Sequence, residues 1–72
     1  SSQNLAMQLF IPAGQTSVRV EHGLTMPPTK VLVTPRGNVG SVWVSDVTEK
    51  HFIINCSIAP SSNIRIDWCA EV

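Results

Sequence analysis

Residues 42–56 read VWVSDVTEKHFIINC, and this stretch decides the fold class. Residues 41–47 and 52–57 are short runs rich in β-branched and aromatic side chains, which are typical of β-strands. The polar residues Glu49, Lys50 and His51 between the two runs have the composition of a turn. No window of ten residues or more has apolar residues at helical spacing, so the chain is interpreted as strand and turn throughout.

Four further strands are predicted on either side of this stretch: residues 5–11, 16–21, 30–34 and 64–70. GLTMPP at 23–28 contains two prolines, which donate no ladder hydrogen bond, and is predicted to connect two sheets. PRGNVG at 35–40 has the Pro and Gly of a turn. Six short strands with short loops predict an all-β fold, a six-stranded antiparallel β-sandwich, with residues 1–72 as one domain.

Alternation along the strands assigns side chains to an inner and an outer set. The inner set is Val31, Val33, Val42, Val44, Phe52, Ile54, Ile64, Ile66 and Trp68. The outer set includes four large apolar residues among polar ones: Ile11, Leu32, Trp43 and Ile53. A freely solvated face is rarely so apolar, so these four are predicted to form an oligomer interface.

Composition supports this interpretation and excludes other classes. A chain of 72 residues forms one small core of marginal stability, and 43% apolar against 14% charged residues suggests that another chain covers part of its surface. Five basic residues balance five acidic ones, so no nucleic-acid partner is expected. The apolar runs are too short to cross a bilayer, and the first ten residues lack signal-peptide features, so any signal is expected to have been removed or never to have existed.

The two cysteines are predicted to be free. Cys56 shares the phase of Phe52 and Ile54, whereas Cys69 follows Trp68 and takes the opposite phase. The last two strands are predicted to form one hairpin with the thiols on its two faces, and a cross-strand disulfide needs both on the same side. We expect one buried thiol and one that is outward or interfacial.

No constellation for metal binding or catalysis is present in the sequence. His22, His51, Cys56 and Cys69 are the only soft ligands, and they lack metal-site spacing, so no metal or cofactor is expected and both histidines are interpreted as solvated turn residues. Ser45, Asp46 and His51 include residue types found in triads. Without a nucleophile elbow or a phosphate-binding glycine loop, they predict no enzyme.

A ligand site is considered at Trp43 and Arg36. An outward tryptophan suits a sugar platform, but it is equally suited to a subunit interface, where tryptophan is enriched. The apolar outer set favours the interface. Arg19 and Glu21, and likewise Arg65 and Asp67, alternate on the outer faces of their strands and are expected to form cross-strand or intersubunit charge pairs.

From Val18 onward the chain resembles the H-type lectin sandwich. The matching stretches are the paired prolines before KVLVTP, then VWVSDVTEKHFIINC and the closing IRIDWCAEV. The positions that match the family pattern are Thr48, Phe52, Cys56, Ile66 and Trp68. The resemblance implies an N-terminal strand and turn at 1–14 and a lectin-like sandwich at 15–72. The chain is also similar to trimeric modules of bacteriophage virions, which are found in tail-fibre tips and head-decoration proteins. The resemblance to the lectins and the resemblance to the phage modules both imply a homotrimer.

The family's sugar site, however, is not matched. The resemblance implies an aromatic and a histidine in the loop after Cys56, where this chain has SIAPSSN, and an arginine on the preceding strand, where it has Trp43. The expected function is therefore a non-catalytic structural or adhesion trimer of a phage particle, located in a virion or outside the cell. Its partners would be its own copies, other virion proteins or a cell-surface glycan. The alternative is a secreted carbohydrate-binding lectin with a site around Trp43 and Arg36.

Overall fold

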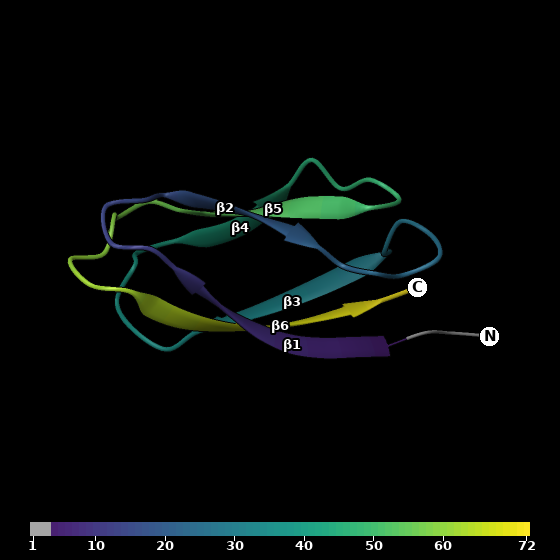
Figure 1. The fold of residues 1–72 in the computed structure, drawn as a ribbon, viewed down its shortest axis with the longest axis horizontal. Helices are drawn as coiled ribbons and strands as arrows, with labels where there is room; N and C mark the ends of the chain where they lie inside the picture. The colour runs from purple at the N-terminus through teal and green to yellow at the C-terminus, as the bar shows by residue number, and fades with distance from the viewer. Residues whose placement is uncertain (1–3) are drawn as a thin grey trace.

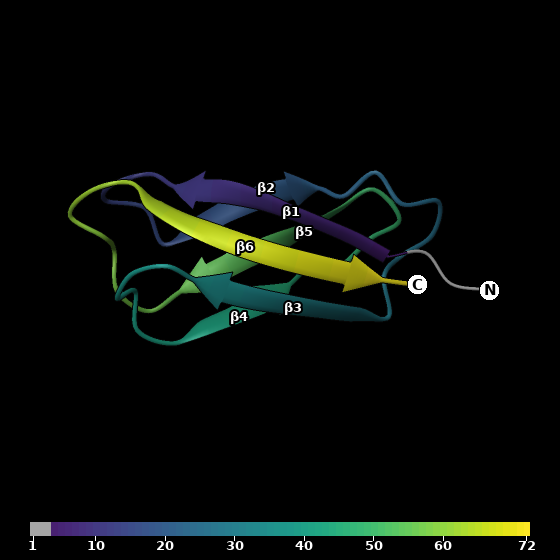
Figure 2. The same ribbon diagram turned by 90° about the horizontal axis from the view of Figure 1, so that it is seen from below.

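A computed structural model describes residues 4–72 as six antiparallel β-strands in two sheets of three, without a helix in that range. The strands are β1 (Asn4–Ile11), β2 (Ser17–Glu21), β3 (Lys30–Pro35), β4 (Val42–Ser45), β5 (His51–Cys56) and β6 (Ile64–Glu71). The first sheet has the order β1-β6-β3 and the second the order β2-β5-β4. Figure 1 shows the two sheets as separate layers, and Figure 2 shows β6 between β1 and β3. The predicted all-β class, the six strands and the antiparallel pairing are confirmed.

The order of the strands explains how a short chain builds two layers. Only β4 and β5 are neighbours both in sequence and in a sheet, and every other connection crosses from one sheet to the other. The prolines of the segment between β2 and β3 lie in one such crossing, as the sequence predicted. The last hairpin was predicted wrongly, because β5 pairs with β2 and β4 whereas β6 pairs with β1 and β3.

The core lies between the sheets and matches most of the predicted inner set. Its largest members meet across the layers: Phe52 of the second sheet packs edge-on against Trp68 of the first, with ring centroids 5.2 Å apart and planes at 86°. The buried apolar residues of the described chain are Ile11, Val20, Val39, Phe52, Ile54, Cys56, Ile66, Trp68 and Ala70. The valines predicted to face inward on β3 and β4 are half-buried and pack against this cluster.

The predicted outer set is wrong at Ile11. This residue is fully buried in the core instead of pointing outward. The register explains this, since Ile11 is opposite Ile64, and Leu9 is opposite the buried Ile66. Leu5, Leu9 and Ile11 of β1 thus face the core, whereas Met7 in the same phase is 53% exposed, a pattern that the mixed sequence NLAMQLFI did not reveal.

His22 is also corrected, because it is a buried residue and only 1% exposed. Its Nε2 lies 2.9 Å from the Thr48 carbonyl and must donate, whereas Nδ1 accepts the Leu24 amide hydrogen at 3.0 Å. The ring stacks on Phe52 at 6.0 Å with an interplanar angle of 11°. His22 therefore joins the segment after β2 to the turn between β4 and β5. The other histidine, His51, is half-buried at the start of β5, and its Nδ1 is 3.2 Å from Thr48 Oγ1.

One glycine is required by close packing. Gly40, between β3 and β4, has a φ of 73°, which an L side chain rarely adopts. A Cβ at this position would also collide with the side chains of Ser57 and Ile58. The close approach lets the turn hydrogen-bond to the end of β5, where the Ser57 amide donates to Ser41 O at 3.0 Å.

Candidate binding site on the outer face of the first sheet

The outer face of the first sheet is arranged in rows that run across its three strands. Register places Cys69 of β6 between Ala6 of β1 and Leu32 of β3, and we call these three residues the apolar row. Two residues before Cys69 on β6, Asp67 lies between Gln8 of β1 and Thr34 of β3, and we call these three residues the polar row. The face therefore changes from apolar to polar and charged over one strand repeat.

A surface hollow of about 560 Å³ lies over these two rows. It is lined by Ala6, Met7, Gln8, Leu32, Thr34, Arg65, Asp67, Trp68 and Cys69. The volume is within the range of small-molecule sites, about 300–1,000 Å³. Because all three strands of the sheet contribute to its floor, the hollow rests on hydrogen-bonded backbone and not on a loop.

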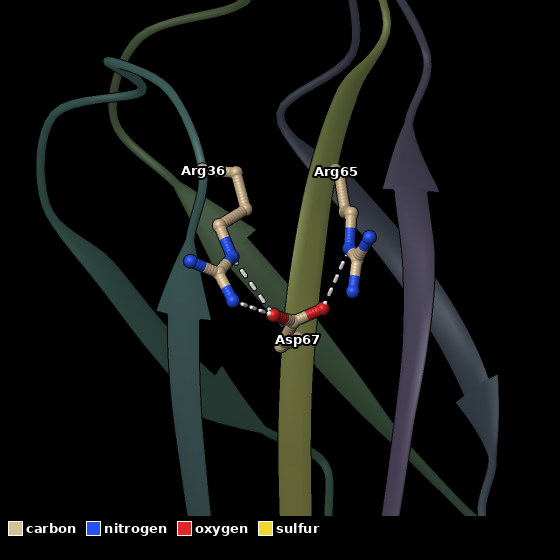
Figure 3. A network of polar contacts seen from close by, with 3 residues as sticks. All are labelled: Arg36, Arg65 and Asp67. Carbon is tan, nitrogen blue, oxygen red and sulfur yellow. Dashed lines mark hydrogen bonds and ion pairs between the residues drawn. The ribbon is translucent and has the colours of Figure 1, made fainter.

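Two arginines share one carboxylate at the polar end of this hollow. Arg36, directly after β3, places Nε 2.8 Å and Nη2 2.7 Å from Asp67 Oδ2. Arg65, two residues before Asp67 on β6, donates from Nε to Oδ1 at 2.9 Å. Figure 3 shows the two guanidinium groups on either side of the carboxylate. Asp67 makes a cross-strand charge pair with Arg36, as the sequence predicted for an outer charge on this strand, whereas its contact with Arg65 lies within β6.

Hydrogen bonding makes this carboxylate more acidic than an ordinary aspartate. The hydrogen bond from Arg65, followed by that from Arg36, holds the pKa of Asp67 below its ordinary value of 3.8. Two positive charges against one negative leave the cluster cationic. Each guanidinium carries five N–H donors, and Arg65 uses only Nε here, so its Nη groups remain available.

The outer face of the second sheet has a different character. Trp43 on β4 is 51% exposed, and its cross-strand neighbour is Asn55 of β5. The Asn55 side-chain amide donates to Ser45 Oγ at 2.9 Å and to the Trp43 carbonyl at 3.4 Å. Ile53 is half-buried beside Ser45. The surroundings of Trp43 are thus more polar than the sequence predicted.

The residues singled out in the sequence do not form one surface. Leu32 lies on the outer face of the first sheet, and Trp43 and Ile53 lie on that of the second. Arg36 binds Asp67 on the first face, so Arg36 and Trp43 are on opposite sides of the sandwich. A ligand site built around both residues is therefore excluded by the geometry.

The residue types of a triad are not assembled either. The hydroxyl of Ser45 donates to Asp46 at 3.5 Å, while the His51 side chain lies against Thr48, with Nδ1 3.2 Å from Oγ1. Within residues 4–72, no group of three or more His, Cys, Asp and Glu could hold a metal ion. The same range has no helix of the length and apolarity needed to span a membrane. Neither Arg19 nor Glu21, both expected to form cross-strand or intersubunit charge pairs, is among the ion pairs of this range.

Fold and site together define an all-β two-layer domain with a hollow on one sheet and a cationic cluster at one end of it. Comparison with protein-family models, with curated proteins and with solved structures finds no match to this chain. Sequence reasoning had missed Gln8, Thr34 and Cys69 as parts of one site. Their shared outer phase was readable, but the order β1-β6-β3 that makes them neighbours was not.

Proposed function

We propose that the chain is a non-catalytic structural or adhesion module that assembles as a homotrimer in a bacteriophage virion, at a tail-fibre tip or as head decoration. The observation that carries the proposal is the exposed apolar surface of such a small domain. Two parts of this surface support the trimer: the second sheet at Trp43 and Ile53, and the edge strand β1.

The first place is a compact patch. Trp43 is opposite Asn55, and Ser45 is opposite Ile53, so Trp43 and Ile53 are diagonal neighbours on one face. Diagonal side chains lie roughly 7–8 Å apart, within reach of an aromatic ring. Half-exposed tryptophan beside an aliphatic residue is typical of the centre of a subunit interface.

The second place is an unprotected sheet edge. β1 is an edge of the first sheet, spans eight residues and has no charged side chain, and Phe10 on it is 54% exposed. The other edges are guarded in ways that proteins use against unwanted pairing. Charged residues stand on β2, lysine and proline on β3, and β4 has only four residues.

A closed trimer with three-fold rotational symmetry needs two different contact surfaces on each copy. Subunit contacts in a closed trimer are heterologous, so the patch of one copy must meet a different surface of the next. Two opposite faces would stack copies in an open row. A face of one sheet and an edge of the other can close a ring, so the Trp43–Ile53 patch against β1 of the neighbour supports the trimer.

The test is the mass in solution of the full chain and of three variants. Light scattering should give three times the 7.8 kDa of one chain. Trp43→Glu and Phe10→Lys should each lower that mass to the monomer value, because each places a charge in the contact. The matched control is Leu32→Glu, on the opposite face and 56% exposed, which should remain trimeric. A folded wild-type monomer would contradict the proposal.

A secreted carbohydrate-binding lectin is the second candidate. It is favoured by the exposed ring of Trp43 beside the amide of Asn55 and the hydroxyl of Ser45. A glycan array separates the candidates, with Trp43→Ala as the control for any bound sugar. Because the loop after Cys56 has no aromatic or histidine side chain, we expect N-acetylgalactosamine to bind no more tightly than about millimolar. Calorimetry that finds micromolar affinity would favour the lectin.

A further inference from the structure

We propose that the hollow on the first sheet binds a small amphiphilic carboxylate, with its apolar body on the apolar row and its carboxylate at Arg65. This goes beyond the proposed function and does not depend on the trimer. Of the predicted subunit contacts, the Trp43–Ile53 patch lies on the other sheet, and Phe10 of the β1 edge lies opposite Arg65, beside the hollow and outside its lining.

The apolar row supplies the site for the ligand body. Ala6, Cys69 and Leu32 lie side by side across the sheet, and Leu32 is 56% exposed, so covering it removes apolar surface from water. Binding sites for small molecules are mostly apolar, with a few polar groups that fix orientation. At about 560 Å³, the hollow accepts a body of a few carbons up to one aromatic ring.

The charged end selects an anion. Arg65 lines the hollow, is 49% exposed at its side chain and is held in place by the Nε contact to Asp67. Its remaining N–H groups are arranged as a fork that fits the two oxygens of a carboxylate. Two guanidinium groups donate to the Asp67 carboxylate and offset its negative charge, so Asp67 repels an anionic ligand less than a lone aspartate would.

Neutral groups complete the polar end. The side chains of Gln8 and Thr34 flank Asp67 across the sheet and line the hollow. They provide further hydrogen bonds to a carboxylate or to a substituent next to it. An apolar body, one anionic group and small size together describe an aliphatic or aromatic monocarboxylic acid.

The experiment is an NMR titration of the full chain with hexanoate. The amides of Leu32, Cys69 and Gln8 should shift saturably, with an affinity on the order of millimolar because the site is open. Those of Ile53 and Asn55, on the opposite face, should not shift. The uncharged analogue hexanamide should bind about tenfold more weakly, and high salt should weaken hexanoate binding.

Variants separate the two ends of the site. Arg65→Gln should weaken hexanoate about tenfold, whereas Arg19→Gln, the same change on the other sheet, should have no effect. Leu32→Ser should remove the gain in affinity from acetate to hexanoate but leave the affinity for acetate. Retained spectral dispersion in each variant shows that the fold is intact.

Thiol reactivity gives an independent readout. Saturating hexanoate should slow alkylation of the half-buried Cys69 in the hollow, while the buried Cys56 is the internal reference. Three results would overturn the proposal: equal binding of hexanoate and hexanamide, the same shifts with sulfate, which would indicate an adventitious ion only, or no shifts at all. The mass measurement is separate, so failure here leaves the trimer proposal standing, and the reverse also holds.

Discussion

The fold lowers the pKa of Asp67, and the titration of this carboxyl group can be measured directly. Because the Arg65 and Arg36 hydrogen bonds lower its pKa, the midpoint in an NMR carboxyl titration should lie below 3.8. Arg65→Gln removes the larger contribution and should move the midpoint upward. A midpoint at or above 3.8 in the wild type would contradict the geometry of the network.

The same shift has a consequence for stability. A carboxyl group whose pKa is lower in the folded than in the unfolded state stabilises the fold at pH values above its ordinary pKa of 3.8. This contribution is lost as the pH falls from 3.8 through the lowered pKa. Wild type should therefore exceed Asp67→Asn in free energy of unfolding near neutral pH, and the difference should shrink below pH 3.8. Urea unfolding at several pH values measures this, and a difference that grows with acidity would contradict it.

His22 shows what a single buried polar residue contributes to a small core. His22→Ala removes the stacking on Phe52 and leaves the Thr48 carbonyl and the Leu24 amide without their partner. We expect a loss of about 2–4 kcal/mol in the free energy of unfolding. The control His51→Ala, at a half-buried position, should cost about 1 kcal/mol. Equal costs in urea unfolding would contradict the assigned role.

At the level of the elements, local pattern predicted strand positions well and pairing poorly. Every strand was predicted to within a few residues, because β-branched runs and turn residues are local signals. The partners of β6 were missed because four of the five connections cross between sheets, and chain order does not encode that. The face of β1 was missed because apolar residues lie on both of its sides.

The candidate site was therefore only partly predictable. Arg65, Asp67 and Arg36 were each noticed as outer charges or ligand candidates. Their meeting at one point requires β3 and β6 to be neighbours, with Thr34 opposite Asp67. The hollow depends on the same neighbour relation, so it could not be predicted from the composition of any one strand.

Strand pairing gives a new reason for the predicted free thiols. Cys56 faces the core from the second sheet, and Cys69 faces outward from the first, so the sulfurs belong to different layers. Alkylation without reductant should modify two cysteines in the unfolded chain, and in the folded chain Cys69 should react before Cys56. An intact disulfide in mass spectrometry would show that the layer assignment of β5 or β6 is wrong.

At the scale of the whole molecule, the number of buried residues limits what one copy can do alone. The described chain buries nine apolar residues, and the large side chains of Phe10 and Trp43 at the proposed contacts remain more than half exposed. Burying one such side chain contributes about 1.5–3 kcal/mol, so the two in each copy rival the net stability of a small domain, about 5 kcal/mol. Assembly and folding should therefore be coupled.

Coupling makes the unfolding temperature depend on concentration. In the proposed trimer, dilution should lower the melting temperature of the wild type, because dissociation accompanies unfolding. Trp43→Glu should melt at a lower temperature, and its midpoint should no longer depend on dilution, because the charge leaves only a monomer to unfold. Leu32→Glu should keep the dependence, since Leu32 lies on the face opposite the patch. Calorimetry over a range of protein concentrations measures all three. A wild-type midpoint that is independent of dilution, with a mass of 7.8 kDa, would mean that one core is sufficient and that the exposed apolar residues serve another partner.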